Sequence, residues 1–313
     1  MINLITTLLI ICGLLLCLLI GCFVCFCMTF YSKTRKNDLG FSLPPGPVYE
    51  PYRETMHGWA DEVEKMDHED VEILSYDGLT LRGKFYEFSP DADIELMFPG
   101  YRGSAKRDLC GGVQRCFALG RSALVVDQRG CGRSDGHIIT FGVREYRDCL
   151  SWVNYLTELF GGTRRIILTG ISMGASTVLN ASGQELPENV IGVIADCGFT
   201  SPKEIIQKVI RDMKLPPKLL YPFIRLSGMI YGGFDIESIC SKDSVKNANI
   251  PVFFAHGDGD DFVPCSMSQD NYDACSSTKL FLKVPGAGHG LAYVVDPEGY
   301  IEALKQIKKQ YSK

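Results

Sequence analysis

The stretch that decides the fold is Ile166-Ile167-Leu168-Thr169-Gly170-Ile171-Ser172-Met173-Gly174. An apolar strand here runs into Gly-x-Ser-x-Gly, and a helical pattern starts at Ala175. A strand that turns sharply into a helix at a serine forms a nucleophile elbow, which lifts the hydroxyl above the edge of the sheet. The N-terminus of the next helix also favours developing negative charge. We therefore expect Ser172 to be a catalytic nucleophile, rather than an incidental serine in a glycine-rich turn.

Strand-like and helix-like segments alternate on both sides of this elbow. Strands are expected at residues 71–76, 79–88, 94–98, 123–127, 166–169, 190–195, 252–255 and 280–284. Helices are expected at residues 106–119, 143–160, 175–184, 266–275 and 297–310, the last with Asp296 as its N-cap. The later strands are short apolar runs, which is typical of strands covered on both faces. The sequence predicts an α/β fold with a mostly parallel eight-stranded sheet, antiparallel at its start, and flanking helices.

Three parts of the chain are expected to differ in role. Residues 1–32 are interpreted as a transmembrane anchor, residues 33–66 as a juxtamembrane linker and residues 67–313 as the catalytic domain. The linker contains a proline-rich stretch at residues 43–47 that cannot continue a helix, and residues 59–66 suggest a short amphipathic helix near the bilayer. Residues 200–249 interrupt the alternation with prolines and glycines among apolar residues. We expect this segment to form a small helical cap inserted between two strands.

The anchor is predicted from the first 32 residues, which carry no charged side chain. Their dense apolar part, Leu8–Phe30, would span about 35 Å as a helix, and the hydrocarbon core of a bilayer is roughly 30 Å thick. A cleaved signal peptide would show a positive start and a shorter apolar region. A lipoprotein signal, suggested by Leu19-Ile20-Gly21-Cys22, is opposed by the apolar residues that continue beyond it. Three basic residues at positions 33–36 follow the span, so the positive-inside rule predicts a single-pass protein of the cell membrane with a cytoplasmic catalytic domain.

Composition excludes some classes of function. The net charge is −5 and no basic stripe is present, which argues against nucleic-acid binding. The 13 cysteines lie in a chain that is long enough to build its own core, so we expect free thiols in a reducing compartment. Cys22 and Cys25 have the spacing of a redox or metal motif, but a thiolate in this apolar run would be desolvated. No metal ion or organic cofactor is implied.

A serine hydroxyl needs a neighbouring base, and two histidines follow Ser172 in the chain. His256 lies at the end of an expected strand, and His289 lies in a glycine-rich loop after the last strand. Hydrolases with this elbow have the chain order serine, acid, histidine. His289 is therefore expected to be the base, and His256 to shape the loop that carries the acid.

The acid that orients the histidine is harder to assign from spacing. Asp258, Asp260 and Asp261 lie within four residues of one another, and Asp196 ends the preceding strand. The acid must accept a hydrogen bond from the imidazole and hold its tautomer. Because alternate residues of a loop can both point inward, spacing alone leaves all four carboxylates open.

Several further motifs follow one another in a familiar order. They are Phe98-Pro99-Gly100-Tyr101-Arg102-Gly103-Ser104, Asp127-Gln128-Arg129-Gly130-Cys131-Gly132-Arg133-Ser134-Asp135-Gly136, the elbow, His256-Gly257-x-x-Asp260-x-x-Val263-Pro264 and Gly288-His289. With them, the chain from about residue 71 onward resembles the α/β-hydrolase superfamily, in particular its bacterial membrane-anchored, serine-aminopeptidase-like (S33-type) group.

The resemblance implies which residues complete the site. It maps the acid onto Asp260, and it places the oxyanion-hole amides at Met173 and Tyr101. The chain has Pro99-Gly100 where His-Gly is commoner, a change that keeps the backbone donor of Tyr101. The glycine-rich turn after Asp127 lacks the Gly-Lys-Ser/Thr ending of a phosphate loop.

These features predict a serine hydrolase that cleaves an ester, a thioester or a similar acyl bond. The apolar cap and the membrane anchor suit a small or lipophilic acyl substrate, by analogy of fold. An aminopeptidase-type peptidase would instead need an acidic pocket for the substrate amine, which Glu204 or Asp212 would supply. An acyltransferase would use the same residues, and a catalytically silent membrane-tethered binding protein is the alternative from another class.

Overall fold

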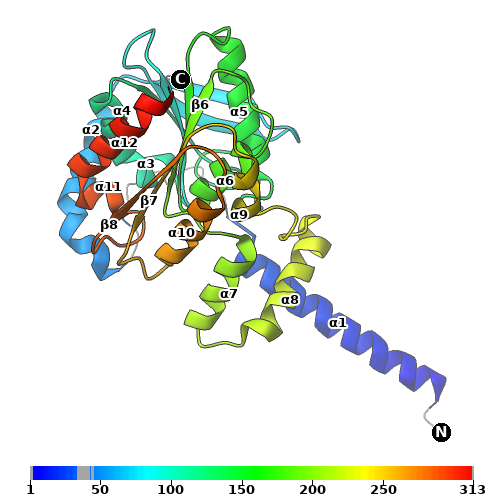
Figure 1. Cartoon of the computed structure of the whole chain (residues 1–313). Helices are drawn as coiled ribbons and strands as arrows, with labels where there is room; N and C mark the ends of the chain where they lie inside the picture. Colours follow the sequence, from blue (N-terminus) through cyan, green and yellow to red (C-terminus); the bar gives the residue numbers. More distant parts are fainter. Residues whose placement is uncertain (1–2, 34–42, 44–45, 312–313) are drawn as a thin grey trace.

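The computed structural model describes residues 3–33, 43 and 46–311, and its core is one twisted sheet (Figure 1). The strands lie in the order β1-β2-β4-β3-β5-β6-β7-β8; β2 pairs antiparallel with β1 and β4, and the other neighbours pair in parallel. They are β1 (Glu69–Leu74), β2 (Thr80–Tyr86), β3 (Ile94–Phe98), β4 (Ser122–Val126), β5 (Ile166–Ile171), β6 (Val190–Asp196), β7 (Val252–Gly257) and β8 (Lys279–Val284). The predicted eight-stranded sheet is confirmed.

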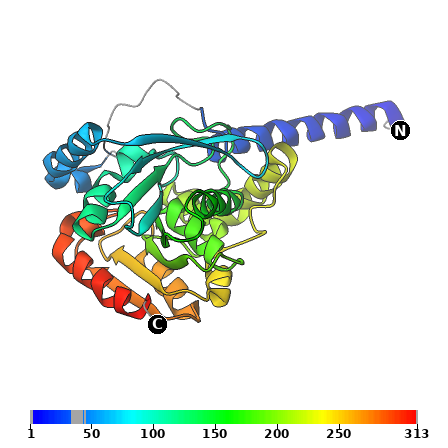
Figure 2. The same cartoon turned by 90° about the horizontal axis from the view of Figure 1, so that it is seen from above.

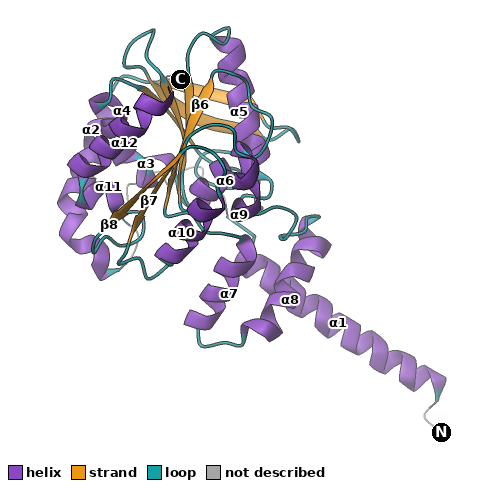
Figure 3. Ribbon diagram, in the orientation of Figure 1, coloured by secondary structure: helices purple, strands orange, loops and turns teal. Residues whose placement is uncertain are grey.

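Helices cover both faces of the sheet (Figure 3). One face packs against α5 (Glu145–Leu159) and α6 (Met173–Ser182), and α10 (Cys265–Ala274) lies beside β7. The other face packs against α4 (Cys110–Ala118), α11 (Ala292–Val295) and α12 (Pro297–Tyr311). Asp296 accepts a hydrogen bond from the Gly299 amide, as expected of the N-cap of α12.

The two-sided cover explains why the central strands read as continuous apolar runs. In β3, Ile94, Leu96 and Phe98 belong to the cluster under α5 and α6, while Met97 packs with α4 on the opposite face. Successive side chains of a strand point to opposite faces, so a strand buried on both sides has no polar alternation. This arrangement leaves the carboxyl ends of β5, β6 and β7 together at one edge, where the functional loops lie.

Two segments differ from the sequence-based expectation. The helix expected at residues 106–119 is split at Leu109 into α3 (Ala105–Asp108) and α4, and the first turn of α4 lies close to its neighbours. A Cβ on Gly111 would lie 2.7 Å from the Trp59 ring, and a Cβ on Gly112 would lie 2.4 Å from the Met97 side chain.

The predicted linker at residues 33–66 contains ordered structure that belongs to the domain. It forms the 3₁₀ helix η1 (Pro47–Tyr52) and the helix α2 (Arg53–Lys65), which packs against α4. Figure 2 shows α2 on the opposite side of the domain from the projecting α1 (Leu4–Thr29), so the amphipathic stretch does not lie beside α1. The basic positions 35 and 36 and the prolines at 44 and 45 lie outside the described residues.

The predicted cap is confirmed between β6 and β7. It consists of α7 (Pro202–Asp212), α8 (Pro217–Ser227), the π-helical turn η2 (Gly228–Gly232), α9 (Ser241–Ser244) and the 3₁₀ turn η3 (Val245–Asn247). The N-terminal α1 is long and apolar enough to cross a membrane. Its last turns pack against α8 and η2, while its N-terminal part projects away from the domain (Figure 1).

Candidate active site

Ser172 occupies the turn between β5 and α6, with φ 57° and ψ −116°. L-residues rarely adopt such a conformation, because their Cβ atom crowds the backbone. The glycines on either side make room for the turn. A Cβ on Gly170 would lie 2.1 Å from the Gly174 carbonyl oxygen, and a Cβ on Gly174 would lie 2.1 Å from the Phe98 carbonyl oxygen. The Gly-x-Ser-x-Gly pattern therefore follows from close backbone packing around a strained serine.

The structure brings the predicted serine, histidine and aspartate into one hydrogen-bonded chain. His289 Nε2 lies 2.9 Å from Ser172 Oγ, and His289 Nδ1 lies 2.7 Å from Asp260 Oδ2. An ionised carboxylate can only accept, so the proton of a neutral imidazole is assigned to Nδ1. That assignment leaves Nε2 free to accept the hydrogen bond that the Ser172 hydroxyl donates.

Asp260 is buried, and donors surround both of its oxygens. Oδ1 accepts from the amides of Phe262 at 2.9 Å and Val263 at 2.8 Å, while Oδ2 accepts from His289 and from His256 Nε2 at 3.1 Å. Burial acts to raise the pKa of Asp260, but the hydrogen bonds and charge of the two histidines outweigh it and lower the pKa below its ordinary value. Asp260 is therefore held as a carboxylate.

His256 is fully buried and positions the acid loop. Its Nε2 also lies 2.9 Å from the Val263 carbonyl oxygen, which can only accept, so this nitrogen carries a proton. Its Nδ1 lies 2.7 Å from the Ser268 hydroxyl on α10. His256 thereby ties Asp260 to the body of the domain and makes no contact with Ser172.

The other three candidate carboxylates have different surroundings. Asp258 is exposed and accepts from the Gly286 amide at 2.6 Å, which links the acid loop to the histidine loop. Asp261 is exposed, and its backbone carbonyl accepts from Lys208. Asp196 is buried at the end of β6, where Oδ2 accepts from the Tyr300 hydroxyl at 3.2 Å. Among the described residues, Asp196 Oδ1 has no hydrogen-bond partner.

The predicted oxyanion donors lie on two sides of Ser172. Met173 begins α6, and Tyr101 follows β3 in a loop that also lines the cavities at Ser172. Within the described part of the chain, neither of these two amides donates to a protein acceptor. Two free N–H groups beside Ser172 are what an oxyanion that develops there would require.

Two polar side chains that the sequence did not single out hold this loop. Asp108 Oδ2 accepts from the Gly100 amide at 2.9 Å, and Gln128 Nε2 donates to the Pro99 carbonyl at 2.6 Å. Gln128 Oε1 in turn accepts from the Thr177 hydroxyl on α6 at 3.0 Å. Gln128 lies inside the motif that starts at Asp127, so the motif was the available signal for it.

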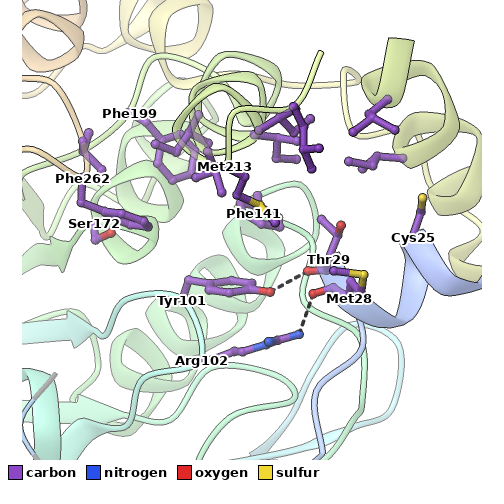
Figure 4. Close-up of a pocket in the computed structure, with 18 residues that line it drawn as sticks. Cys25, Met28, Thr29, Tyr101, Arg102, Phe141, Ser172, Phe199, Met213 and Phe262 are labelled. Atoms are coloured by element: carbon purple, nitrogen blue, oxygen red, sulfur yellow. Dashed lines mark hydrogen bonds between the residues drawn. The ribbon is translucent and has the colours of Figure 1, made fainter. Parts of the chain in front are cut away.

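The end of α1 is fastened to the same loop. The Tyr101 hydroxyl donates to the Thr29 carbonyl at 2.7 Å (Figure 4). Arg102 donates to the carbonyls of Met28 at 3.0 Å and Tyr31 at 2.8 Å, which places a cation at the negative end of the helix dipole. Nothing in the sequence indicated that α1 contacts the loop that carries Tyr101.

A second connection joins the N-terminal region to the histidine loop. The Tyr49 hydroxyl of η1 donates to the His289 carbonyl at 3.0 Å. A Cβ on Gly288 would lie 2.5 Å from the Val48 side chain, so the two segments are in close contact. The segment around η1 thus forms part of the wall beside His289.

Two cavities meet at Ser172. The first, of about 460 Å³, is lined almost entirely by apolar side chains of α1, α7, α8 and the loops around Phe141 and Phe199 (Figure 4). The second, of about 420 Å³, lies on the His289 side and includes polar groups of Tyr49, Arg107 and Asp108. Pockets of this size and composition are typical of small-molecule sites.

A mixed cluster at the same place has the residue types of a metal site. One ligand atom each of Cys197, Asp260 and His289 lies within 4.8 Å of the other two. Burial raises the pKa of the Cys197 thiol well above its ordinary range, which opposes the thiolate that a metal requires. His289 and Asp260 are already engaged with each other and with Ser172, so a metal would compete with that chain. Among the described side chains, twelve cysteines are free thiols.

Comparisons with known proteins agree with the fold. The family described as the alpha/beta hydrolase fold matches residues 96–227. The uncharacterized protein YqkD of Bacillus subtilis is 24% identical over 60% of this chain, which spans 62% of that relative and so less than two thirds of its length. Thiohydrolase apmlB of Arthrinium phaeospermum is 30% identical over 50% of this chain and 54% of its own length.

A solved structure extends the likeness over most of the chain. The Pyrococcus furiosus esterase Pf2001 has a TM-score of 0.63 at 22% identity, with 87% of this chain and 99% of the esterase covered. The S33-type assignment stays a prediction. The fold, the family match over residues 96–227 and this likeness agree that the chain has the α/β-hydrolase fold.

Proposed function

We propose that the protein is a serine hydrolase that transfers the acyl group of an ester or thioester to water. The observation that carries the proposal is the hydrogen-bonded chain from Ser172 through His289 to Asp260, on a strained elbow between an apolar and a polar cavity. The esterase and thiohydrolase named above support this reaction class.

In the proposed reaction, Ser172 Oγ attacks the carbonyl carbon while His289 Nε2 takes the hydroxyl proton. Asp260 holds the tautomer and stabilises the imidazolium, and the amides of Tyr101 and Met173 bind the oxyanion. The bond to the leaving group then breaks as His289 gives it the proton. Water then attacks the acyl-enzyme while His289 Nε2 takes its proton. The bond to Ser172 Oγ breaks as His289 returns the proton to the serine, and the acid is released.

An acyl substrate fits the two cavities better than a peptide N-terminus does. The apolar cavity can hold a hydrocarbon chain, and the polar cavity can hold the leaving alcohol or thiol. Glu204 and Asp212, the predicted partners of a substrate amine, line neither cavity. Glu204 contacts the Thr200 hydroxyl, and Asp212 pairs with Lys208 at 2.6 Å.

We also propose that α1 crosses the cell membrane once and leaves the domain on the cytoplasmic side. Its length and apolar composition support the crossing. The orientation rests on the basic residues that follow it, of which Lys33 lies within the described residues and is exposed.

Labelling of membranes with a fluorophosphonate probe tests the proposal. Wild type is expected to label, Ser172→Ala to lose labelling completely, and His289→Ala to label far more slowly because the serine lacks its base. Ser176→Ala is the matched control: this buried serine lies one turn further along α6, and its removal should leave labelling intact. A folded wild type that never labels would overturn the hydrolase proposal and favour a membrane-tethered binding protein. Cleavage of aminoacyl p-nitroanilides in preference to p-nitrophenyl esters would favour the peptidase.

A further inference from the structure

The apolar cavity at Ser172 is partly built by the membrane anchor itself. Cys25, Met28 and Thr29 of α1 line it, together with side chains of α7 and α8 (Figure 4). Met28 of α1, and Met213 and Leu215 just beyond the end of α7, line the cavity and are also exposed. The cavity therefore reaches the surface between α1 and the cap. A helix that only attached the domain to a membrane would not need to line this cavity.

The fit of α1 against the cap is specific over its last turns. Cys22, Phe26 and Phe30 are buried, and Phe26 and Phe30 belong to the same apolar cluster as the cap helices. The Phe30 ring lies 5.1 Å from the Phe234 ring, edge to face. The Tyr231 hydroxyl of η2 donates to the Leu19 carbonyl at 2.9 Å. The contact with the domain therefore extends from Leu19 to the end of the helix.

The free part of α1 is too short to span a bilayer alone. Every residue from Leu4 to Cys17 is exposed, which is 14 residues (17 − 4 + 1). At about 1.5 Å per residue this part is about 21 Å long, whereas the hydrocarbon core is roughly 30 Å thick. If α1 spans the membrane, the next turns must lie in hydrocarbon as well, and the adjoining surface of the cap goes in with them.

That surface of the cap has the composition of a membrane interface. Met213, Leu215 and Leu219 at the α7–α8 connection, and Met229 and Ile230 of η2, are large exposed apolar side chains. Exposed cations are interspersed with them: Arg211, Lys214 and Lys218. Apolar residues flanked by cations bind at the boundary between lipid chains and anionic headgroups.

We propose that the cavity is an acyl-chain slot open to the bilayer between α1 and the cap, and that the substrate is a membrane-resident lipid ester or thioester whose acyl chain enters sideways. The inference rests on the proposed hydrolase function and on α1 crossing the membrane. The acyl carbon would meet Ser172 at the inner end of the slot. The leaving group would occupy the polar cavity beside His289. The Ser172 Oγ–acyl bond would form first, and the bond to that group would then break as His289 gives it a proton.

Chain-length selectivity tests the slot. Cys25→Trp fills it from α1, and Met213→Trp fills it from the connection after α7 if the first variant folds poorly. Val24→Trp, at an exposed position next to Cys25, is the matched control. Hydrolysis of p-nitrophenyl butyrate and p-nitrophenyl decanoate is compared in phosphatidylcholine vesicles. Each methylene excluded from an apolar site is worth about a fourfold rate loss.

The slot variants are expected to lower the decanoate-to-butyrate ratio at least tenfold, and Val24→Trp to stay within twofold of wild type. A wild-type ratio in both slot variants, with both esters hydrolysed, would overturn the slot and leave the hydrolase standing. A wild type that neither hydrolyses the esters nor labels with fluorophosphonate would overturn the hydrolase proposal and the slot with it.

Insertion of the cap is tested in the full-length protein by quenching with brominated phosphatidylcholine. Ile230→Trp adds a tryptophan on η2, and Leu74→Trp adds one at an exposed apolar position on β1. The emission of the two native tryptophans is subtracted from each. Ile230→Trp is expected to be quenched by at least half and Leu74→Trp hardly at all. Equal quenching of the two would contradict lateral access from the bilayer.

Discussion

Two buried carboxyl groups near His289 are expected to respond in opposite ways when each loses its charge. Asp260 has both oxygens occupied by donors: two amides at Oδ1 and two imidazoles at Oδ2. An asparagine here must turn its NH₂ group toward one of those donors. Asp196 accepts one hydrogen bond, from Tyr300, and its other oxygen has no partner among the described residues. An asparagine fits that environment without a clash of donors.

The magnitude for Asp260→Asn follows from its two roles. Loss of the carboxylate that holds the histidine tautomer costs about 10⁴-fold in kcat in a serine–histidine–aspartate site, which is about 5.5 kcal/mol of transition-state stabilisation. One buried donor left unsatisfied costs a further ~1–3 kcal/mol of folding free energy. We expect Asp260→Asn to lose almost all activity and some stability.

Asp196→Asn is expected to gain stability in a way that depends on pH. Burial raises the pKa of Asp196 from 3.8 to about 6, although His256 and Tyr300 act to lower it. The folded protein thus holds this proton more tightly than the unfolded chain, so the charged group destabilises the fold above pH 6, and the penalty vanishes as pH falls below the unfolded value. A rise of this size in the pKa corresponds to roughly 3 kcal/mol of folding free energy. The variant should therefore unfold at a higher denaturant concentration than wild type near pH 8. Near pH 4 the two proteins should unfold at about the same concentration.

Chemical unfolding at the two pH values and ester hydrolysis measure both effects. Asp196→Asn is expected to keep kcat within a few-fold of wild type. The reasoning is refuted if Asp196→Asn abolishes hydrolysis while Asp260→Asn retains it, since Asp196 would then be the orienting acid. A stabilisation that is the same at both pH values would show that burial of charge is not its cause.

Two further substitutions test the support of the oxyanion loop. Arg102→Gln removes a cation that donates to two carbonyls at the end of α1. The midpoint temperature of thermal unfolding in detergent should therefore fall by about 2–4 °C, which corresponds to about 1 kcal/mol. An unchanged midpoint would mean that this contact contributes nothing to stability. Gln128→Glu removes the buried donor to the Pro99 carbonyl and keeps the acceptor for Thr177. The loop should then shift and displace the Tyr101 amide, which should lower kcat about tenfold with little change in KM. A rise in KM alone would assign Gln128 to substrate binding instead.

Much of the fold and the centre of the site followed from local patterns. The parallel strands were visible because burial on both faces leaves each one continuously apolar. Ser172 could be picked out from the sequence because the turn tolerates only small neighbours. His289 could be picked out because the chain order of such sites excluded His256. These signals are local, and each is imposed by backbone geometry or by the order of elements.

The residues that hold the loops of the site in place could not be predicted from the sequence. Tyr49 acts through a hydrogen bond to a backbone carbonyl 240 residues away, and Asp108 through one to a backbone amide eight residues before it. A polar residue in either segment looks the same in the sequence whether or not it makes such a bond. The packing of α1 was hidden in the same way. Phe26, which faces the cap, and Val24, which is exposed, are equally apolar, because lipid and protein interior select the same residue types.

The arrangement of the two cavities gives α1 a role beyond the membrane attachment proposed for it. α1 and the cap build the apolar cavity, whereas η1 and the histidine loop build part of the polar one, and Ser172 lies between them. If the cap surface lies in the bilayer, the scissile carbonyl is held where lipid chains give way to water. The acyl product would then return to the membrane while the leaving group departs into the aqueous phase. Because Tyr101 is hydrogen-bonded to Thr29 at the end of α1, the oxyanion loop is fixed to the element that sets this depth.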